Sequence, residues 1–147
     1  MKQIIQTIIF AVLLSLIGGG EAAAQCKGFA KSLCKKELGA YLHDGNYHAA
    51  VLVEGEEAEL YETFYSDLDY RLVICGADGL PPIEFTVLDA TGKVLYSNRE
   101  GDLANIWDFK LEASQQLKIM IKVTTSGIKD ELPASGCVAI MFGFKAK

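Results

Sequence analysis

The sequence is poor in the residues that most enzyme sites and nucleic-acid surfaces require. It has two histidines, no Cys-x-x-Cys pair and no Gly-x-Ser-x-Gly segment. These absences disfavour a structural zinc site and a serine nucleophile on a tight elbow. Nineteen acidic residues against fourteen basic ones give a formal net charge of −5. That balance argues against a nucleic-acid partner, which needs a basic surface.

The two histidines, His43 and His48, lie in one turn region with Asp44 between them. Together the three could hold a metal ion, but catalytic metal sites take their ligands from rigid elements. Solvated turn histidines are therefore the better interpretation. An acidic run over residues 54–59 matches no compact calcium loop. We expect neither a metal nor a cofactor.

The N-terminus has the order of a secretory signal peptide. Lys2 precedes an apolar run from Ile4 to Ile17, and three glycines lead to the small residues Ala22–Ala24. The apolar run is shorter than the ~20 residues of a membrane span, so no transmembrane segment is expected in the mature form. We predict a signal peptide over 1–24 and a single secreted or periplasmic domain over 25–147.

Lipid attachment at Cys26 is a rival hypothesis, which would tether the domain to the envelope. Lipoprotein processing needs a small residue before the cysteine, and here the bulky, polar Gln25 precedes it. A lipid-anchored form is therefore less favoured than a free one.

The mature part contains all four cysteines, and an even number in an exported chain indicates two disulfides. Strand alternation places Cys75 and Cys137 on like faces of their strands. If those strands are adjacent and antiparallel, the two residues can meet at bonding distance. We therefore predict the bond Cys75–Cys137 and, by elimination, Cys26–Cys34.

One helix and a series of strands are predicted. Residues 26–42 form the helix, with Phe29, Leu33, Leu38 and Leu42 on one face. Downstream the apolar residues follow a period of two. The predicted strands cover 47–54, 58–65, 70–75, 83–89, 93–97, 106–111, 116–124 and 137–145. A type I turn over 89–92, closed by Gly92, is predicted to join two of them as a hairpin. The pattern indicates an all-β, jelly-roll-like β-sandwich of about eight strands with one short N-terminal helix. An immunoglobulin-like arrangement is the alternative.

Two tyrosines and two aspartates are the candidate binding residues. Tyr61 and Tyr65 share one face of their strand, as the flat aromatic platforms of sugar-binding sandwiches do. Phe64 on the other face competes for the core, so alternation alone does not decide which face is buried. Asp67 and Asp69 form a short Asp-x-Asp turn. Such turns bind calcium on some extracellular sandwiches, although aspartate is also a favoured turn residue.

One family resemblance can be named. Between Glu59 and Leu95 the segment DYRLVI is followed by IEFTVLD-x-x-G-x-VL. This pattern resembles the bacterial pre-peptidase C-terminal domain, a small secreted sandwich. The final strand begins Gly-Cys-Val at residue 136, and in this it is similar to small exported proteins of Gram-negative bacteria. The pre-peptidase domain usually accompanies a protease or another enzyme, and this chain contains no such companion domain. The resemblance therefore implies a fold more than a function.

The leading functional prediction is a non-enzymatic exported β-sandwich. It would have a binding or structural role at the cell envelope or outside the cell, with a protein or a glycan as partner. A carbohydrate-binding module and a small hydrolase with an unrecognised site are the alternatives. Binding is expected on the loops 66–69, 76–82 and 98–105, or on the sheet face that carries Tyr61 and Tyr65.

Overall fold

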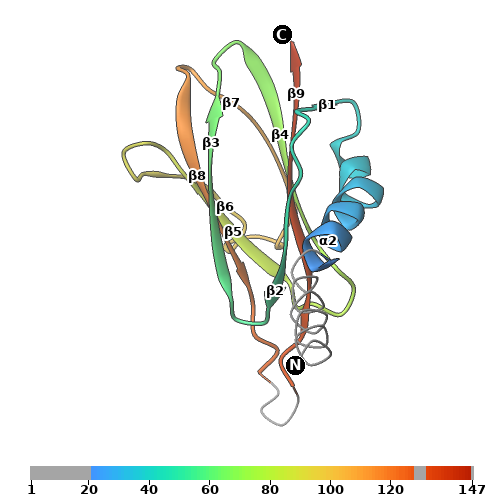
Figure 1. Ribbon diagram of the computed structural model, residues 1–147. Coiled ribbons are helices and arrows are strands. Elements are labelled where there is room, and N and C mark those ends of the chain that lie inside the picture. The colour runs from blue at the N-terminus through green and yellow to red at the C-terminus, as the bar shows by residue number, and fades with distance from the viewer. Residues whose placement is uncertain (1–20, 128–131, 147) are drawn as a thin grey trace, which may run out of the picture.

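Two antiparallel β-sheets lie face to face, and one helical segment packs outside one of them (Figure 1). The computed structural model describes residues 21–127 and 132–146. In chain order the elements are α2 (Glu21–Ser32), the 3₁₀ turn η1 (Cys34–Leu38), β1 (Leu42–His43), β2 (His48–Val53), β3 (Glu57–Phe64), β4 (Leu68–Gly76), β5 (Ile83–Leu88), β6 (Val94–Ser97), β7 (Ile106–Lys110), β8 (Gln115–Val123) and β9 (Ser135–Ala146). The predicted all-β sandwich with a short N-terminal helix is confirmed. Residues 1–20 of the predicted signal peptide lie outside the described residues, and residues 21–24 begin α2.

The two sheets differ in what lies on their outer faces. One sheet has the order β1-β9-β4-β7, with β2 also paired to β9, and α2 and η1 lie on it. We call it the covered sheet. The other has the order β3-β8-β5-β6, and Figure 1 shows no helix on its outer side. We call it the bare sheet.

Apolar residues from both sheets meet between them. The strand with the clearest alternation, β8, places Leu117, Ile119, Ile121 and Val123 in this core, each exposed by no more than 4%. Phe64, Phe85 and Phe142 are the largest fully buried side chains there. Each of these apolar side chains contributes roughly 1.5–3 kcal/mol to folding. Alternation therefore places the core residues of β8 correctly.

The helical segment packs on the covered sheet mainly through small residues. Cys26, Ala30, Cys34 and Leu38 follow one another at intervals of four and are at most 2% exposed. They contact a second apolar cluster made by Val73, Ala139 and Met141. The predicted helix face was right for Leu38, which is buried, and for Phe29, which packs against this cluster. It was wrong for Leu33 and Leu42, which are 56% and 65% exposed. The helix also ends earlier than predicted. Leu42 instead belongs to β1, where it pairs with Phe144 of β9.

The structure joins Cys26 to Cys137 and Cys34 to Cys75, with Cα atoms 5.2 and 5.7 Å apart. All four cysteines are bonded as predicted, but the predicted pairing was wrong. Cys75 and Cys137 do share a face of adjacent strands, yet the register pairs Cys75 with Ala139. Cys137 is a diagonal neighbour, about 7–8 Å away, which is too far for a bond.

A bond between Cys26 and Cys34 is excluded by the helix itself. Eight residues of helix separate positions by about 12 Å. Each cysteine of the helical segment instead reaches a different strand of the covered sheet, because the segment lies across that face.

The bond of Cys26 also bears on the lipid-anchor hypothesis. Its sulfur is bonded to Cys137 and the residue is fully buried, so no thiol is free there to carry a lipid. No helix in the described ranges is long and apolar enough to cross a membrane.

Candidate binding surface

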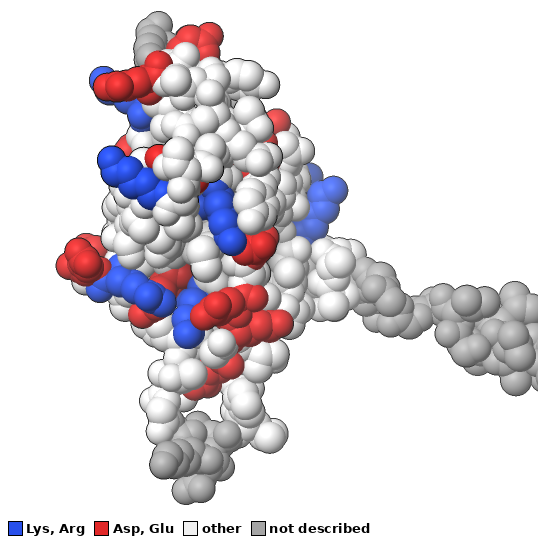
Figure 2. All heavy atoms as spheres, turned by 90° about the vertical axis from the view of Figure 1, so that its left-hand side faces the viewer, with Lys and Arg blue, Asp and Glu red and all other residues white. Residues whose placement is uncertain are grey.

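The outer face of the bare sheet is polar and carries charges of both signs. Figure 2 looks onto this side of the molecule, and it shows Lys and Arg interspersed with Asp and Glu. Along β3 the outward positions are Glu57, Glu59, Tyr61 and Thr63, all exposed. Met120 of β8 is 37% exposed on the same side. This face is accessible to a partner without any rearrangement of the fold.

Most cations on this face are already paired. Lys118 lies 2.6 Å from Glu59, Lys122 lies 3.0 Å from Glu57, and Arg99 lies 2.6 Å from Glu84. The hydrogen bond from Lys118 to Glu59 raises the pKa of the Lys118 ammonium. The pairs bridge neighbouring strands, since Glu57 and Lys122 lie directly opposite each other. In each ion pair the two charges cancel, so the strands themselves carry little net charge.

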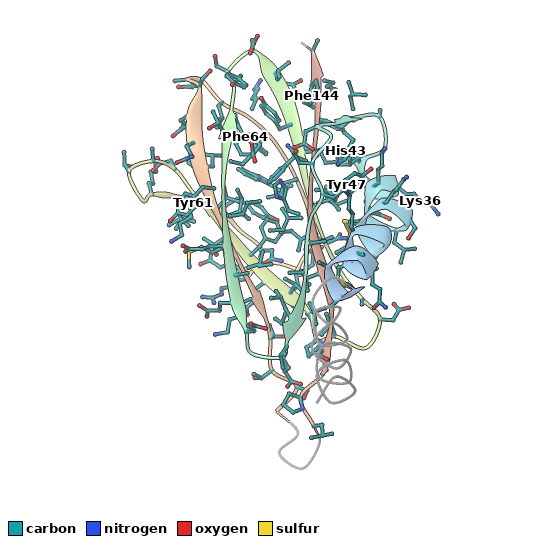
Figure 3. The ribbon with its side chains drawn as sticks, viewed as in Figure 1. Lys36, His43, Tyr47, Tyr61, Phe64 and Phe144 are labelled. Atoms are coloured by element: carbon teal, nitrogen blue, oxygen red, sulfur yellow. A yellow bond between two sulfur atoms is a disulfide. The ribbon has the colours of Figure 1, made fainter. Side chains whose placement is uncertain are left out.

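Tyr61 stands in the middle of this arrangement. Its side chain is 51% exposed, and the Lys118 ammonium lies 5.5 Å from its ring centroid. Together with Leu88, Gly92 and Gln116 it lines a hollow of about 370 Å³ on the sheet face. Figure 3 shows Tyr61 on the side of the sandwich away from the helical segment. Tyr61, one of the predicted binding residues, therefore lies on an open surface, and Phe64 of the same strand faces the core.

The β5–β6 connection projects beside this hollow, visible as the olive loop at the left of Figure 1. One oxygen of Asp89 accepts hydrogen bonds from the Thr91 amide (2.8 Å), the Thr91 hydroxyl (2.7 Å) and the Lys93 amide (3.0 Å). The Thr91 hydroxyl is the main cause of the lowered pKa of Asp89. Gly92 has φ +85°, a conformation that glycine adopts without strain. The sequence predicted this turn, and the structure shows that it is braced from within.

Tyr65, the second predicted tyrosine, lies at the other end of β3. It is 56% exposed, and its amide donates a hydrogen bond to the Tyr70 hydroxyl at 2.9 Å. With Phe64 and Phe144 it lines an apolar groove of about 280 Å³ beside β9. Four residues of strand place Tyr65 about 13 Å from Tyr61. The two tyrosines therefore line different hollows and do not form one aromatic platform.

The aspartates of the predicted Asp-x-Asp turn have different surroundings. Asp67 is exposed, whereas Asp69 is half-buried in β4 opposite Lys110 and Lys145. Within the described part of the chain, no three His, Cys, Asp or Glu side chains come close enough together to hold a metal ion.

The histidines have separate partners. His43 Nε2 lies 2.9 Å from the Asn46 carbonyl oxygen, inside its own turn. His48 Nε2 lies 3.9 Å from a Glu62 carboxylate oxygen. The two rings therefore do not converge on one site.

Two of the three loops predicted for binding come together. Loops 76–82 and 98–105 and the helical segment surround a hollow of about 540 Å³, with Leu33 and Leu103 among its lining residues. Leu103 has φ 56°, the one non-glycine residue in the described ranges with positive φ. The loop 66–69 does not line this hollow.

The single tryptophan is part of an aromatic stack. Trp107 lies between Tyr96 and Phe109, with centroids 5.0 and 4.3 Å away and interplanar angles of 17° and 12°. The indole is engaged in this stack and only partly exposed, which disfavours Trp107 as a flat platform for a sugar ring. This stack could not be predicted from the sequence, because its members come from β6 and β7 of different sheets.

Comparison with known proteins extends this description. No protein-family model matches the chain, and no curated protein matches it either. The resemblance to the pre-peptidase C-terminal domain therefore stays a prediction.

Among solved structures, the chain is similar to PliG from Aeromonas hydrophila, a periplasmic lysozyme inhibitor of g-type lysozyme. The TM-score is 0.51 and the identity 11%, over 72% of this chain and 89% of that one. A second match is the infectious bursal disease virus VP2 subviral particle, with TM-score 0.37 and 13% identity over 71% of this chain and 32% of that one. The second similarity is too weak to support an argument.

The PliG match establishes a shared fold. The chain is a two-sheet β-sandwich of a kind also found in a periplasmic enzyme inhibitor, and its two disulfides fit an exported protein.

Proposed function

We propose that the protein is an exported, non-enzymatic binding protein whose partner is a protein, and that it inhibits a lysozyme. The observation that carries the proposal is the fold shared with a periplasmic lysozyme inhibitor over 72% of the chain. The sequence points independently to export, through the predicted signal peptide and the even number of cysteines.

The arrangement of the molecule supports recognition of a macromolecule. Two disulfides hold the helical segment on the covered sheet, and the opposite face is open. A rigid, open surface binds with little loss of conformational freedom. The net charge of −5 would speed association with a basic enzyme.

The residues that could act as acids or bases support a non-enzymatic role. His43 is engaged within its own turn, and His48 lies beside Glu62 on another strand. On the bare sheet, Glu57 and Glu59 are held in ion pairs with lysines.

Inhibition assays with purified protein test the proposal. The protein is expressed with its complete N-terminal sequence, recovered from the periplasm, and added to lysozymes of the g-type and of other types acting on a peptidoglycan suspension. We expect one lysozyme type to be inhibited at one-to-one stoichiometry, with a complex visible by calorimetry. Protein that has been reduced and alkylated is the control and should not inhibit. Unimpaired lysis with every lysozyme type would refute the proposal.

A carbohydrate-binding module is the second candidate. The exposed ring of Tyr61 beside a shallow hollow is the observation that favours it. A glycan array read with the wild-type protein and the Tyr61→Ala variant tests it. Glycan binding lost in the variant would favour this candidate over the protein partner.

A further inference from the structure

We propose that the apolar groove beside β9 binds a small organic cation, an ammonium group carried on an aromatic or short apolar body. The groove lies between the edges of the two sheets rather than on the outer face of the bare one, and the inference does not depend on the proposed inhibition of a lysozyme. Three observations support it: the opening in the fold, the aromatic rings around it and the carboxylates that line it.

The opening follows from the strand order at one edge of the sandwich. On the covered sheet β1 and β2 both pair with β9, and residues 44–47 between them form no strand. On the bare sheet the edge strand is β3. Residues from both edges line the groove. Its volume of about 280 Å³ is close to the lower end of the range for small-molecule sites, roughly 300–1,000 Å³, so a ligand with a single ring or a short chain fits it.

Aromatic side chains from both sheets surround the groove. Phe64 of β3 and Phe144 of β9 lie at the same end of the sandwich (Figure 3). Phe64, Tyr70 and Phe142 are nearly fully buried and form the floor, with the Phe64 ring edge-on to the other two at centroid distances of 4.9 and 5.3 Å. Tyr65, 56% exposed, and the half-buried Phe144 are the more accessible rings. The face of an aromatic ring attracts a cation that lies within about 6 Å.

The carboxylates that line the groove are those of Asp44 and Glu62, with side chains 19% and 29% exposed. His43 Nε2 lies 3.4 Å from an Asp44 oxygen, and His48 Nε2 lies 3.9 Å from a Glu62 oxygen. Asp44 also accepts a hydrogen bond from the Asn46 amide at 2.9 Å. Histidine and asparagine carry no permanent charge, so these partners do not neutralise the carboxylates as a lysine or an arginine would.

The Tyr70 hydroxyl lies in the same negative surroundings. Burial raises the pKa of Tyr70, and the nearby charges of Asp67 and Glu62 raise it further, against the opposing effect of the hydrogen bond from the Tyr65 amide. Among the described residues, no lysine or arginine lines the groove. An anionic ligand such as a fatty acid would therefore be repelled here, whereas a cation is attracted both by the carboxylates and by the ring faces.

The cost of removing water favours a cation over a neutral ligand of the same shape. A neutral apolar ligand would displace water from Asp44 and Glu62 and offer these carboxylates nothing in return, which costs free energy. An ammonium group replaces the lost water with charge-assisted hydrogen bonds, while its apolar body packs on the aromatic rings. The groove thus matches both halves of such a ligand.

The test uses three probes that share one phenylethyl body and differ in charge: 2-phenylethylammonium, 2-phenylethanol and 3-phenylpropanoate. Each is titrated into isotope-labelled protein, expressed with its complete N-terminal sequence and recovered from the periplasm, and the NMR shifts of the Tyr65 and Gly143 amides at the groove are followed. We expect the ammonium to bind about tenfold more tightly than the alcohol and the propanoate not to bind. High salt should weaken binding of the ammonium but not of the alcohol.

Charge variants with a matched control sharpen the test. Glu62→Gln and Asp44→Asn each remove one carboxylate and keep the shape of the groove. Each should weaken binding of the ammonium about two- to fivefold and leave binding of the alcohol unchanged. Glu112→Gln removes the same charge from an exposed residue outside the groove and should bind both probes as the wild type does. Urea midpoints are measured in parallel, and if Glu62→Gln does not fold, Asp44→Asn and the salt dependence decide.

The contrary outcomes are distinct from those of the inhibition assays. Equal affinity for the ammonium and the alcohol, or tighter binding of the propanoate, would overturn the inference, as would the absence of binding by all three probes. An equal loss in Glu112→Gln and Glu62→Gln would show that net charge and not the groove attracts the cation, and would also overturn it. Failure to inhibit any lysozyme would refute the proposed function and leave this inference in place.

Discussion

The two outer faces of the sandwich have opposite characters. On the covered sheet Val73, Ala139 and Met141 are completely buried beneath the helical segment. On the bare sheet the corresponding outward positions carry paired charges and an exposed tyrosine. The covered face therefore stabilises the fold, and the bare face is available for recognition.

The disulfides belong entirely to the covered face. Cys137 lies in β9 and Cys75 in β4, and each is bonded to a different point of the helical segment. Because the segment is held at two points on two strands, it can neither rotate nor slide on the sheet.

Removing a disulfide should give the largest loss of stability. The bonds close loops of 41 and 111 residues. The chain-entropy model then gives losses of about 4 kcal/mol for Cys34→Ala with Cys75→Ala and about 5 kcal/mol for Cys26→Ala with Cys137→Ala. Urea unfolding of the two double variants measures both. Two midpoints equal to that of the wild type would show that the bonds do not stabilise the fold.

A pair of methionines allows a matched comparison of the two faces. Met141 is fully buried on the covered sheet, whereas Met120 is 37% exposed on the bare one. Met141→Ala should cost about 2–5 kcal/mol through lost packing and a residual cavity, and Met120→Ala at most about 0.5 kcal/mol. The same unfolding experiment gives both values. Equal losses would contradict the distinction between the faces.

The ion pair beside the helical segment should contribute less to stability than either disulfide or the buried Met141. Arg71 donates to both Asp108 oxygens at 2.7 Å and lies 4.7 Å from the Tyr41 ring centroid. The hydrogen bond from Arg71 is the main reason that the pKa of Asp108 lies below its ordinary value. A carboxylate with a lowered folded-state pKa stabilises the fold above its unfolded-state pKa, near 3.9. That contribution is lost as the pH falls through the folded-state pKa.

Asp108→Asn should therefore lower the stability at pH 7 by at most about 1 kcal/mol, because the pair is partly exposed. The difference from the wild type should shrink as the pH falls below the ordinary aspartate pKa near 3.9 and disappear once the pH lies below the folded-state pKa. Unfolding free energies measured from pH 7 to pH 2.5 test both statements. Glu84→Gln, which breaks a pair with one hydrogen bond on the bare sheet, is the control with a smaller expected loss. A difference that persisted in acid would show that the carboxylate charge is not the cause.

Local patterns in the sequence predicted the strands well. The alternating residues of 116–124 appear in β8 as Leu117, Ile119 and Ile121 facing the core. The turn at 89–92 was also foreseen, because Asp and Gly at those positions define its geometry locally. In both cases the deciding interactions lie within a few residues of one another.

The buried face of the helical segment was predicted only in part, for a physical reason. Apolar spacing predicted Leu33 as buried, but that side chain is exposed, and the sheet beneath accepts the small residues Ala30 and Cys34. A helix that is bonded to the sheet at two cysteines must present the side that carries them. That constraint comes from strands far away in the chain.

The candidate site was foreseen only in part. Tyr61 was named from alternation, and the structure places it on an exposed face. The ion pairs around it were not predicted, because each pair joins side chains from separate strands or loops.

By itself the sequence determined the strands, their two faces and the fact that Cys75 and Cys137 share one face, because side-chain direction follows a period of two along each strand. The tertiary structure alone decided which cysteines bond. A shift of two residues in register preserves the face of every side chain and changes every partner, so alternation cannot distinguish Ala139 from Cys137 as the neighbour of Cys75. Register, the position of the helical segment and the pairing of charges all depend on contacts between distant parts of the chain.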